Sequence, residues 1–304
     1  MTATPDSLRS HYPVAIVGAG ALGLAFAARL AATGPVAVIA RNAARAAELA
    51  RGVQIGGQLR RLDVFAPDAL PTADWAVLLV KTGDTDAAAR LASALQPHGL
   101  LSLQNGLIEA ELRKACPALA AGQGVTTEGA YRDATGIHPS GAGETLLPPG
   151  FEDLAALFVR AGFVARVDPD IARARLAKLL VNLAINPLAA LFRVPNGALL
   201  EPPHRVLLDT LVREALPVLR ANGLDLDEVA ALSRVHGVAR ATAANRASML
   251  QDVLAGRRTE IDAITGALLG MAETGGFEVP THRAVHTLVR AVEHAATGTP
   301  SDRG

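Results

Sequence analysis

The chain has 304 residues and a single cysteine, Cys116. One cysteine cannot form a disulfide within the chain, and no neighbouring motif favours thiolate chemistry at this position. We therefore expect Cys116 to be a small buried side chain. The first ten residues also lack the apolar run of a signal peptide, so the sequence predicts a reducing, cytoplasmic location.

An excess of charge is missing as well, because 29 basic and 29 acidic residues cancel. No global field then favours nucleic acid or an anionic membrane as a partner, and any anion site must be local. Half of the residues are apolar, which argues against intrinsic disorder and allows substantial cores. A chain of this length is expected to form two domains.

The sequence has no uninterrupted apolar run of membrane-spanning length. The most apolar helix-like stretch, 176–192, is broken by Lys178, Asn182, Asn186 and Pro187. Charged and amide side chains are costly inside a bilayer. We expect a buried helix with a polar stripe instead of a membrane span.

A metal-ligand set is absent from the sequence pattern. Among the eight histidines, His282 and His286 have the i, i+4 spacing of a helical pair, but no third ligand is evident. The Ser-His-Asp and glycine-elbow motifs of nucleophilic enzymes do not occur either. The sequence predicts no metal site.

Apolar runs alternate with alanine-rich helical patterns in the first part of the chain, as in βαβ units with a parallel sheet. From about 122 to 149 short segments are separated by turn formers, which we interpret as antiparallel strands. From Ile171 onward only long helical patterns follow. The prediction is an α/β N-terminal Rossmann-type domain, residues 1–169, plus an all-α C-terminal domain, residues 170–304. The expected parallel strands are 14–17, 36–40, 75–80 and 100–103.

A glycine-rich turn follows the first expected strand and precedes a helical pattern. Its residues are Gly18, Ala19, Gly20, Ala21, Leu22 and Gly23. In a dinucleotide-binding turn the first glycine permits the tight turn, the second admits the pyrophosphate, and the third lets helix and strand pack closely. The helix N-terminus adds N–H donors for the phosphates. The alternative is a chance glycine-rich turn, which the strand-turn-helix setting disfavours.

Arg41 stands at the end of the second expected strand, where NAD enzymes usually have an acidic residue that binds the ribose 2′-hydroxyl. No acidic residue occurs from Gly23 to Ala47, whereas Arg41, Asn42 and Arg45 offer donors for a 2′-phosphate. The sequence therefore predicts NADPH as the cofactor in preference to NADH. The alternative is a solvated arginine in an arginine-rich protein.

Lysine is scarce, because only Lys81, Lys114 and Lys178 occur among the 29 basic residues. Lysine can give up a proton in a partly dry site, whereas arginine cannot easily do so. Lys81 and Asn105 each follow an expected strand, and ligands of open α/β sheets bind at the carboxyl ends of strands. The plainer alternatives are that the remaining lysines, Lys114 among them, occur where they do by chance, and that Asn105 begins an ordinary Asn-Gly turn.

Lys178, Asn182 and Asn186 fall at i, i+4 and i+8, which places them along one face of a helix. Polar groups on an apolar helix are costly unless they line a cleft or satisfy one another. Pro187 disfavours helical geometry at Asn186, so we expect the helix to bend or end there and to present that amide outward. The alternative is a buried polar network.

Glu260 lies between Thr259 and Asp262, which resemble a variant capping box. A carboxylate in the first turn of a helix is favourable against the helix dipole. The functional interpretation is a carboxylate that accepts substrate hydroxyls and holds the lysine charged or oriented. Both interpretations are open at this point.

The chain closely resembles the ketopantoate reductase family, also called the 2-dehydropantoate 2-reductases, over nearly its whole length. Three stretches carry the resemblance, namely Gly18–Gly23, Lys178–Pro187 and Ser248–Asp262. The last two are specific to the family.

The resemblance implies a role for each matching residue. Lys178 is then the general acid, Glu260 hydrogen-bonds the substrate, and Ala130 lies near the nicotinamide ring. Asn105 is expected at both the substrate and the nicotinamide-ribose end of NADPH, which Lys81 also contacts. The residues expected to hold the substrate are Asn182, Asn186 and Ser248.

The resulting hypothesis is NADPH-dependent reduction of 2-dehydropantoate to pantoate, a step that leads to pantothenate and coenzyme A. The partner is then a small 2-keto acid, and a homodimer stays open. One alternative is a reductase of another 2-keto acid, because a family match fixes the reaction better than the molecule reduced. The other is a non-catalytic NADPH-sensing protein, which would need Arg41 but neither Lys178 nor Glu260.

Overall fold

The structure is a computed structural model that describes residues 9–141 and 143–297. It divides into two compact units. Unit 1 contains the described residues up to Gln104 and the segment Ile108–Ile171, and unit 2 contains Asn105–Leu107 and the described residues from Ala172. The sequence prediction assigned 105–107 to the first domain, and this was wrong. The three residues belong with unit 2 because Leu107 packs against the helical core of that unit.

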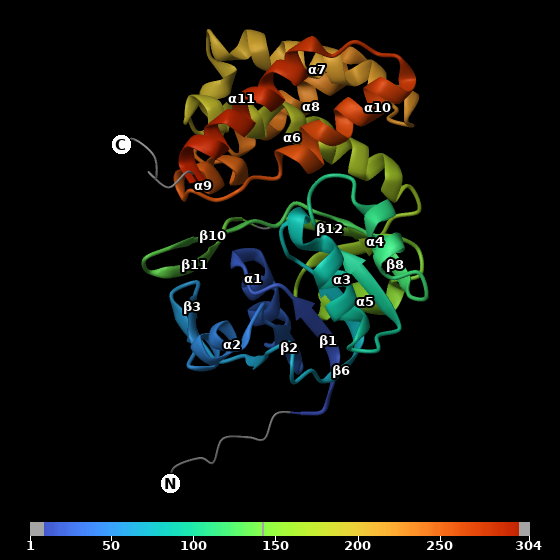
Figure 1. The fold of residues 1–304 in the computed structure, drawn as a ribbon, viewed down its shortest axis with the longest axis vertical. Helices are drawn as coiled ribbons and strands as arrows, with labels where there is room; N and C mark the ends of the chain where they lie inside the picture. Colours follow the sequence, from blue (N-terminus) through green and yellow to red (C-terminus); the bar gives the residue numbers. More distant parts are fainter. Residues whose placement is uncertain (1–8, 142, 298–304) are drawn as a thin grey trace, which may run out of the picture. The chain divides into compact units, whose positions relative to one another are not determined.

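Unit 1 is built on a parallel sheet of six strands in the order β5-β2-β1-β6-β7-β8. Figure 1 labels β2, β1, β6 and β8 of this sheet. Helices cover both faces of a sheet of this kind, so its central strands are almost continuously apolar. The four expected parallel strands are confirmed, whereas β5 and β8 were missed because they are short edge strands with little apolar pattern. The strands are β1 (His11–Val17), β2 (Val36–Ile39), β5 (Asp63–Phe65), β6 (Thr72–Leu78), β7 (Gly99–Ser102) and β8 (Ala120–Gln123).

Two hydrophobic cores lie on opposite faces of this sheet. Val14 and Ile16 of β1 belong to the core with α1 and α5, whereas Ala15 and Val17 belong to the core with α3 and α4. This alternation is the two-residue period of a strand. Cys116 is buried in the second core, as expected. The helices of unit 1 are α1 (Ala21–Leu30), α2 (Ala43–Ala50), the 3-10 turn η1 (Thr82–Asp84), α3 (Thr85–Ser93), α4 (Glu109–Ala115) and α5 (Glu152–Arg160).

Two smaller sheets complete unit 1, in the orders β10-β11-β3-β4 and β13-β12-β9. The expected antiparallel strands are present, because β10 pairs with β11 and β12 pairs with β9. The β3–β4 hairpin was missed, although Gly56-Gly57 is a two-residue hairpin signal. The strands are β3 (Val53–Ile55), β4 (Gln58–Arg60), β9 (Val125–Thr126), β10 (Ala130–Asp133), β11 (Gly136–Pro139), β12 (Glu144–Leu147) and β13 (Val164–Val167).

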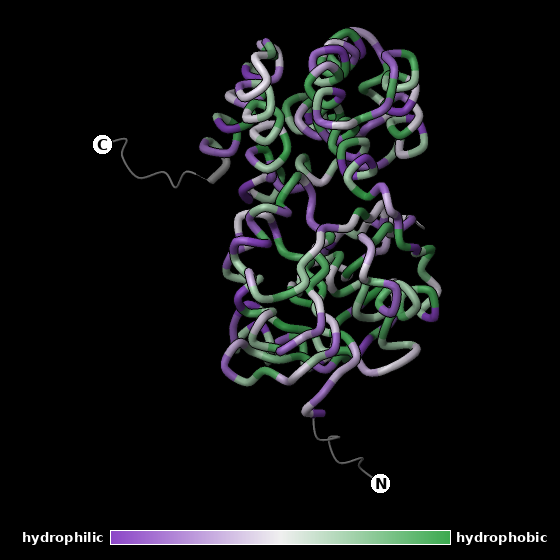
Figure 2. The backbone as a smooth tube through the Cα atoms, turned by 90° about the vertical axis from the view of Figure 1, so that its right-hand side faces the viewer, coloured by the Kyte–Doolittle hydropathy of each residue, from purple (hydrophilic) through white to green (hydrophobic). Residues whose placement is uncertain are grey.

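Unit 2 is helical. Hydrophobic segments, green in Figure 2, occur in both units. One cluster of buried aliphatic side chains joins α6 to the other helices of unit 2. Its elements are α6 (Ile171–Phe192), the 3-10 turn η2 (Asn196–Leu200), α7 (His204–Ala221), α8 (Glu228–Ala241), α9 (Ser248–Leu254), the π-helical turn η3 (Asp262–Gly266), α10 (Ala267–Gly275) and α11 (Pro280–Thr297).

The helix α6 continues through Pro187 and ends at Phe192. Of the expected bend or end at Asn186, an end is therefore wrong, and Asn186 is buried instead of facing outward, contrary to the prediction. Neighbouring side chains such as Leu183 and Leu188 are buried in the core, and this tertiary packing outweighs the local preference of proline. By length and composition α6 could cross a membrane, but 72% of its most apolar window is buried within the protein, as in a core helix.

The N-terminus of α11 is held by Glu214 of α7. The backbone N–H groups of Thr281 and His282 donate to the carboxylate at 3.0 and 3.1 Å, and Nδ1 of His282 lies 3.2 Å from it. Nε2 of His282 is buried and has no hydrogen-bond partner in the described part of the chain. A second proton on this ring would thus leave a buried N–H without an acceptor.

We predict that unit 2 becomes less stable in mildly acidic solution because of His282. Burial lowers the pKa of His282 below its ordinary value of 6.5, although Glu214 opposes this shift. Its contribution to stability is therefore complete above the unfolded pKa and is lost as the pH falls through the lower folded pKa. Thermal unfolding between about pH 8 and about pH 5.5 should show this loss, and His282→Gln should reduce it. A variant of the exposed His294 on the same helix, His294→Gln, should keep the wild-type profile; equal behaviour of the two variants would contradict the assignment.

Candidate functional site

The glycine-rich turn joins β1 to α1. Gly18 has φ +124°, and a Cβ there would lie 2.6 Å from the carbonyl oxygen of Leu79. A Cβ at Gly23 would lie 1.9 Å from the carbonyl oxygen of Gly18. Both positions therefore exclude any side chain, the first for the turn and the second for the close contact between turn and helix.

Gly20 has the opposite environment, because it is exposed and a Cβ there would meet nothing within 4 Å. Gly20 is also the N-cap of α1, and the first turn of this helix contains no acidic residue. The backbone N–H groups at this end are thus open to a ligand in front of Gly20, and the helix dipole favours an anion there. The turn fits the pyrophosphate of a dinucleotide, with Ala19, Ala21 and Leu22 supplying backbone around it.

Arg41 lies two residues after the end of β2 and is exposed. Two neighbours that could also bind a phosphate are engaged within α2. Oδ1 of Asn42 accepts the backbone N–H of Arg45 at 2.8 Å, and the Arg45 guanidinium pairs with Glu48 at 2.5 Å. Among the three donors expected from the sequence, Arg41 is therefore the one best suited to a 2′-phosphate.

Lys81 and Ala130 lie at the ends of other strands in unit 1. Lys81 is exposed and immediately precedes η1, three residues after β6 ends at Leu78. Since β1, β2 and β6 are parallel neighbours, the residues that follow them share one edge of the sheet. Ala130 begins β10 and is partly buried.

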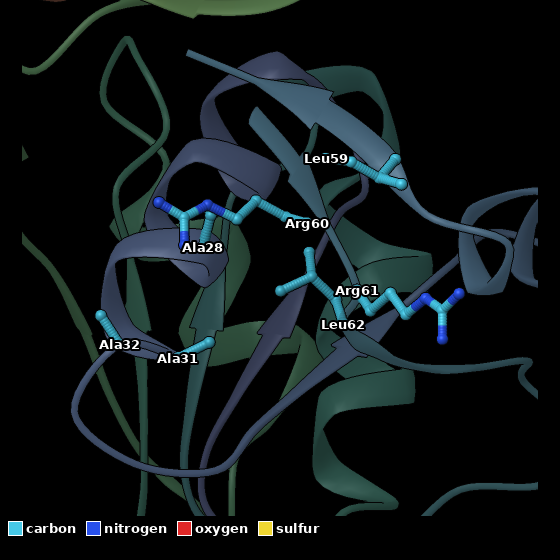
Figure 3. A pocket seen from close by; sticks show the side chains of 7 residues that line it. All are labelled: Ala28, Ala31, Ala32, Leu59, Arg60, Arg61 and Leu62. Atoms are coloured by element: carbon cyan, nitrogen blue, oxygen red, sulfur yellow. The ribbon is translucent and has the colours of Figure 1, made fainter. Parts of the chain in front are cut away.

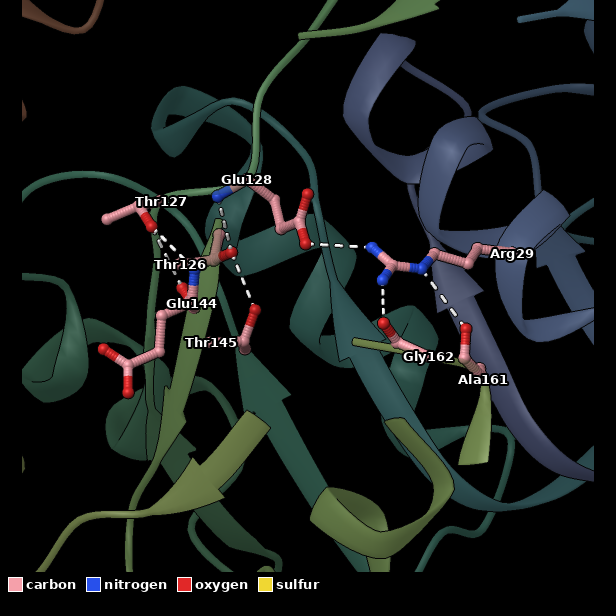
Figure 4. A network of polar contacts seen from close by, with 8 residues as sticks. All are labelled: Arg29, Thr126, Thr127, Glu128, Glu144, Thr145, Ala161 and Gly162. Carbon is pink, nitrogen blue, oxygen red and sulfur yellow. Dashed lines mark hydrogen bonds and ion pairs between the residues drawn. The ribbon is translucent and has the colours of Figure 1, made fainter. Parts of the chain in front are cut away.

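A polar network fixes the segment that leads to Ala130 (Figure 4). The guanidinium of Arg29 donates to Glu128 at 3.0 Å, to the carbonyl of Ala161 at 3.2 Å and to the carbonyl of Gly162. The backbone N–H of Glu128 donates to Thr126 at 3.1 Å. Sequence reasoning missed Arg29 and Glu128, because they are 99 positions apart and no local pattern links them.

A surface hollow of about 350 Å³ also occurs in unit 1, between the end of α1 and β4 (Figure 3). Arg60 lies toward α1 in this view, whereas the Arg61 side chain points away from it. None of the residues expected to bind cofactor or substrate lines this hollow. Its lining residues are Ala28, Ala31, Ala32, Leu59, Arg60, Arg61 and Leu62.

Unit 2 brings three of the expected site residues together. Nδ2 of Asn105 donates to Oε2 of Glu260 at 2.8 Å. Glu260 is only 6% exposed, and its charge acts on Lys178 of α6. The carboxylate is therefore not the exposed partner of a helix dipole, and it stands in a group with an amide and an ammonium.

Lys178 is the titratable centre of this group. Burial lowers the pKa of Lys178 from 10.5 to about 8, and the nearby charge of Glu260 opposes part of this shift. Some surface of the residue stays accessible even though protein surrounds its charged end. A lysine with this pKa is mostly protonated at neutral pH and can release its proton more readily than an ordinary lysine.

The backbone beside Glu260 is anchored to α11. The N–H of Thr259 donates to Glu293 at 2.5 Å, and Asp262 pairs with His286 at 2.9 Å and with Arg290 at 2.6 Å. Oγ1 of Thr259 accepts the N–H of Ile261 at 3.2 Å. The capping box suggested by the sequence is not formed, because Glu293 accepts the Thr259 N–H and the Asp262 carboxylate pairs with His286 and Arg290.

The expected substrate-binding residues differ in exposure. Asn182 of α6 is partly buried and Asn186 is buried, whereas Ser248 is exposed at the first position of α9. His282 and His286 each face a carboxylate of their own, Glu214 and Asp262. Within residues 9–141 and 143–297, no group of three or more His, Cys, Asp or Glu side chains could hold a metal ion.

Comparison with known proteins matches both parts of the chain to the same family. Two family models match, ketopantoate reductase PanE/ApbA over residues 14–150 and its C-terminal model over residues 170–293. A 2-dehydropantoate 2-reductase of Archaeoglobus fulgidus is 33% identical over 291 residues, which are 92% of this chain and 97% of that protein.

Solved structures share the fold. A PanE/ApbA family ketopantoate reductase from Ralstonia eutropha JMP134 has a TM-score of 0.81 and 28% identity, and the match covers 94% of this chain and 99% of the other. D-mandelate dehydrogenase, solved with NADH and anilino(oxo)acetate, has a TM-score of 0.86 over the same shares of the two chains. At 22% identity this second likeness concerns the fold alone.

We predict that Lys178 titrates near its lowered pKa of about 8 and that Glu260→Gln lowers this value further. Removing the carboxylate charge removes the interaction that favours the ammonium form. Lysine labelled with ¹³C at Cε allows the measurement, because the chain has three lysines and Lys178→Arg identifies the signal.

Glu273→Gln is the matched control, because Glu273 is an exposed carboxylate of α10 in the same unit. It should leave the Lys178 signal unchanged. A Lys178 midpoint near the ordinary value of 10.5, or one that Glu260→Gln does not move, would contradict the assignment.

Proposed function

The chain belongs to the ketopantoate reductase family, and from this premise we propose that it reduces 2-dehydropantoate to pantoate with NADPH. The observation that carries the proposal is the group formed by Lys178, Glu260 and Asn105. Reduction of a ketone needs a proton for the carbonyl oxygen, and a lysine with a pKa of about 8 can supply it at neutral pH.

The cofactor is a nicotinamide dinucleotide, which supplies the hydride for the keto carbon when it is bound. The backbone from Gly18 to Gly23 would bind its pyrophosphate, and Lys81 and Ala130 would contact its nicotinamide end. This assignment is supported by the open space in front of Gly20 and by the absence of acidic residues in the first turn of α1.

In the proposed mechanism Lys178 acts on the keto oxygen. Its ammonium group stabilises the negative charge that develops on this oxygen and then donates the proton. Glu260 keeps Lys178 protonated before the reaction by raising its pKa, and Asn105 orients the Glu260 carboxylate through the 2.8 Å hydrogen bond. Asn182, Asn186 and Ser248 would bind the remaining polar groups of the keto acid.

We infer that NADPH is preferred over NADH because of Arg41. This exposed guanidinium follows β2, where an acidic residue would favour the ribose hydroxyls of NADH. Glu48, the first acidic residue along α2, is engaged by Arg45. A 2′-phosphate would thus meet positive charge without a competing carboxylate.

The proposal includes a cytoplasmic location, which the buried, unpaired Cys116 supports. It leaves a homodimer to be tested by light scattering. A related enzyme that reduces another 2-keto acid would share Lys178 and differ in the residues around the substrate. A panel of 2-keto acids therefore belongs in the first assay.

We predict that the purified protein oxidises NADPH in the presence of 2-dehydropantoate and that Lys178→Ala lowers kcat by about a hundredfold or more. The variant loses the proton donor, whereas Lys114→Ala removes an exposed lysine of α4 and should retain wild-type kcat. Wild-type protein that reacts no faster than Lys178→Ala would disprove the proposed mechanism. Faster turnover of another 2-keto acid in the panel would reassign the substrate.

We predict that Arg41→Ala raises the KM for NADPH roughly tenfold, as expected for the loss of one charged hydrogen-bonding partner. The KM for NADH should stay nearly unchanged, because NADH lacks the 2′-phosphate. The control is Arg51→Ala, which removes an exposed arginine at the end of α2. Equal losses with both cofactors would refute the role of Arg41.

A further inference from the structure

Gly106 lies between two residues that attach the same short segment to unit 2. Asn105 binds Glu260 through its side chain, and Leu107 packs against the helical core. The segment 105–107 thus joins unit 2 although the chain before and after it belongs to unit 1. Neither attachment explains why the residue between them is glycine.

The backbone of Gly106 touches the π-helical turn η3 directly. Gly106 has φ +76°, and a Cβ there would lie 2.3 Å from the carbonyl oxygen of Ala263 and 3.0 Å from its Cβ. Ala263 stands three positions after Glu260, within the turn 262–266. Turns of the π type are rare and frequently occur at functional sites. The residue type at 106 therefore controls how closely the segment can approach this turn.

We infer that Gly106 is a positioning residue for the reduction, because its bare backbone sets the distance at which the Asn105 amide meets the Glu260 carboxylate. This inference rests on the proposed function. A side chain at position 106 would push the segment away from Ala263 and lengthen the 2.8 Å hydrogen bond. The carboxylate would then lose the donor that orients it beside Lys178.

The anchoring of η3 decides which side of the contact gives way. The segment with Glu260 is bound to α11 through Thr259 and Asp262, by hydrogen bonds of 2.5 to 2.9 Å. These three hydrogen bonds to one helix hold the segment with Glu260 in place. An added methyl group at 106 would therefore displace Asn105, and Glu260 would stay in place.

The direct test compares Gly106→Ala with Gly276→Ala. Gly276 has a nearly equal φ of +69° but nothing within 4 Å of a Cβ, so the two variants share the backbone strain and differ in the clash. Gly106→Ala should lower kcat about tenfold to a hundredfold. Gly276→Ala should keep the wild-type kcat even if its thermal stability falls. Wild-type kcat in Gly106→Ala would overturn the inference.

A double-mutant cycle separates positioning from general damage. If Gly106 acts through Asn105, Gly106→Ala should cost little more once Asn105→Ala is present. A full additional loss in the Asn105→Ala background would show that the two residues act independently, and it would overturn the inference. If Gly106→Ala does not fold, Ala263→Val presses on the same contact from the opposite side without a positive φ, and the same cycle applies.

The titration of Lys178 keeps this test separate from the proposed function. Asn105→Ala and Gly106→Ala should move the Lys178 ¹³C midpoint in the same direction, and the double variant should move it no further. This result can be obtained even if the wild-type protein reduces no keto acid, in which case the proposed function fails and the positioning role stands. An unchanged Lys178 midpoint in Gly106→Ala would reject the positioning role by itself.

Discussion

The burial of Lys178 beside Glu260 sets the acid strength of the ammonium group. Burial alone favours the neutral amine, and the carboxylate favours the charged form, so the pKa of about 8 is a balance between the two. A fully exposed lysine would hold its proton too firmly to be an efficient acid near neutral pH. A buried lysine without a carboxylate would have a still lower pKa, and too small a fraction of it would be protonated at neutral pH.

The remainder of unit 2 serves this balance by holding each charged group at a fixed place. Lys178 stands on α6, whose neighbouring side chains are buried in one aliphatic core, so its backbone has little freedom to move. Glu260 is held through its neighbours by α11 and through its own carboxylate by Asn105. A buried carboxylate is tolerated only when such partners are present. The same hydrogen bonds therefore stabilise the fold and orient the group that adjusts the lysine.

The sequence was sufficient wherever a local pattern determines the structure. The turn Gly18–Gly23 and the central strands follow from spacing and residue type, because sterics and the two-residue period act over a few positions. The sequence was insufficient where contacts between residues far apart in the chain determine the local structure. The helix α6 passes through Pro187 because core packing outweighs a local preference, and Asn105 belongs to unit 2 because of partners more than 150 positions away. The ion pair of Arg29 with Glu128 is equally invisible in the sequence.

The chemistry of the group around Lys178 explains why a lysine stands there in a protein that otherwise uses arginine. Arginine would keep its charge in the same environment, because its pKa is too high for burial to bring it near neutrality. Of the two basic residues, only lysine can be converted by burial into a group that both stabilises negative charge and releases a proton. Arginine serves in ion pairs on the surface of the described residues, such as that of Arg213 with Glu228, where only charge is needed. Lys178 stands at the position where the proposed chemistry requires a transferable proton, and there arginine could supply the charge but not the reaction.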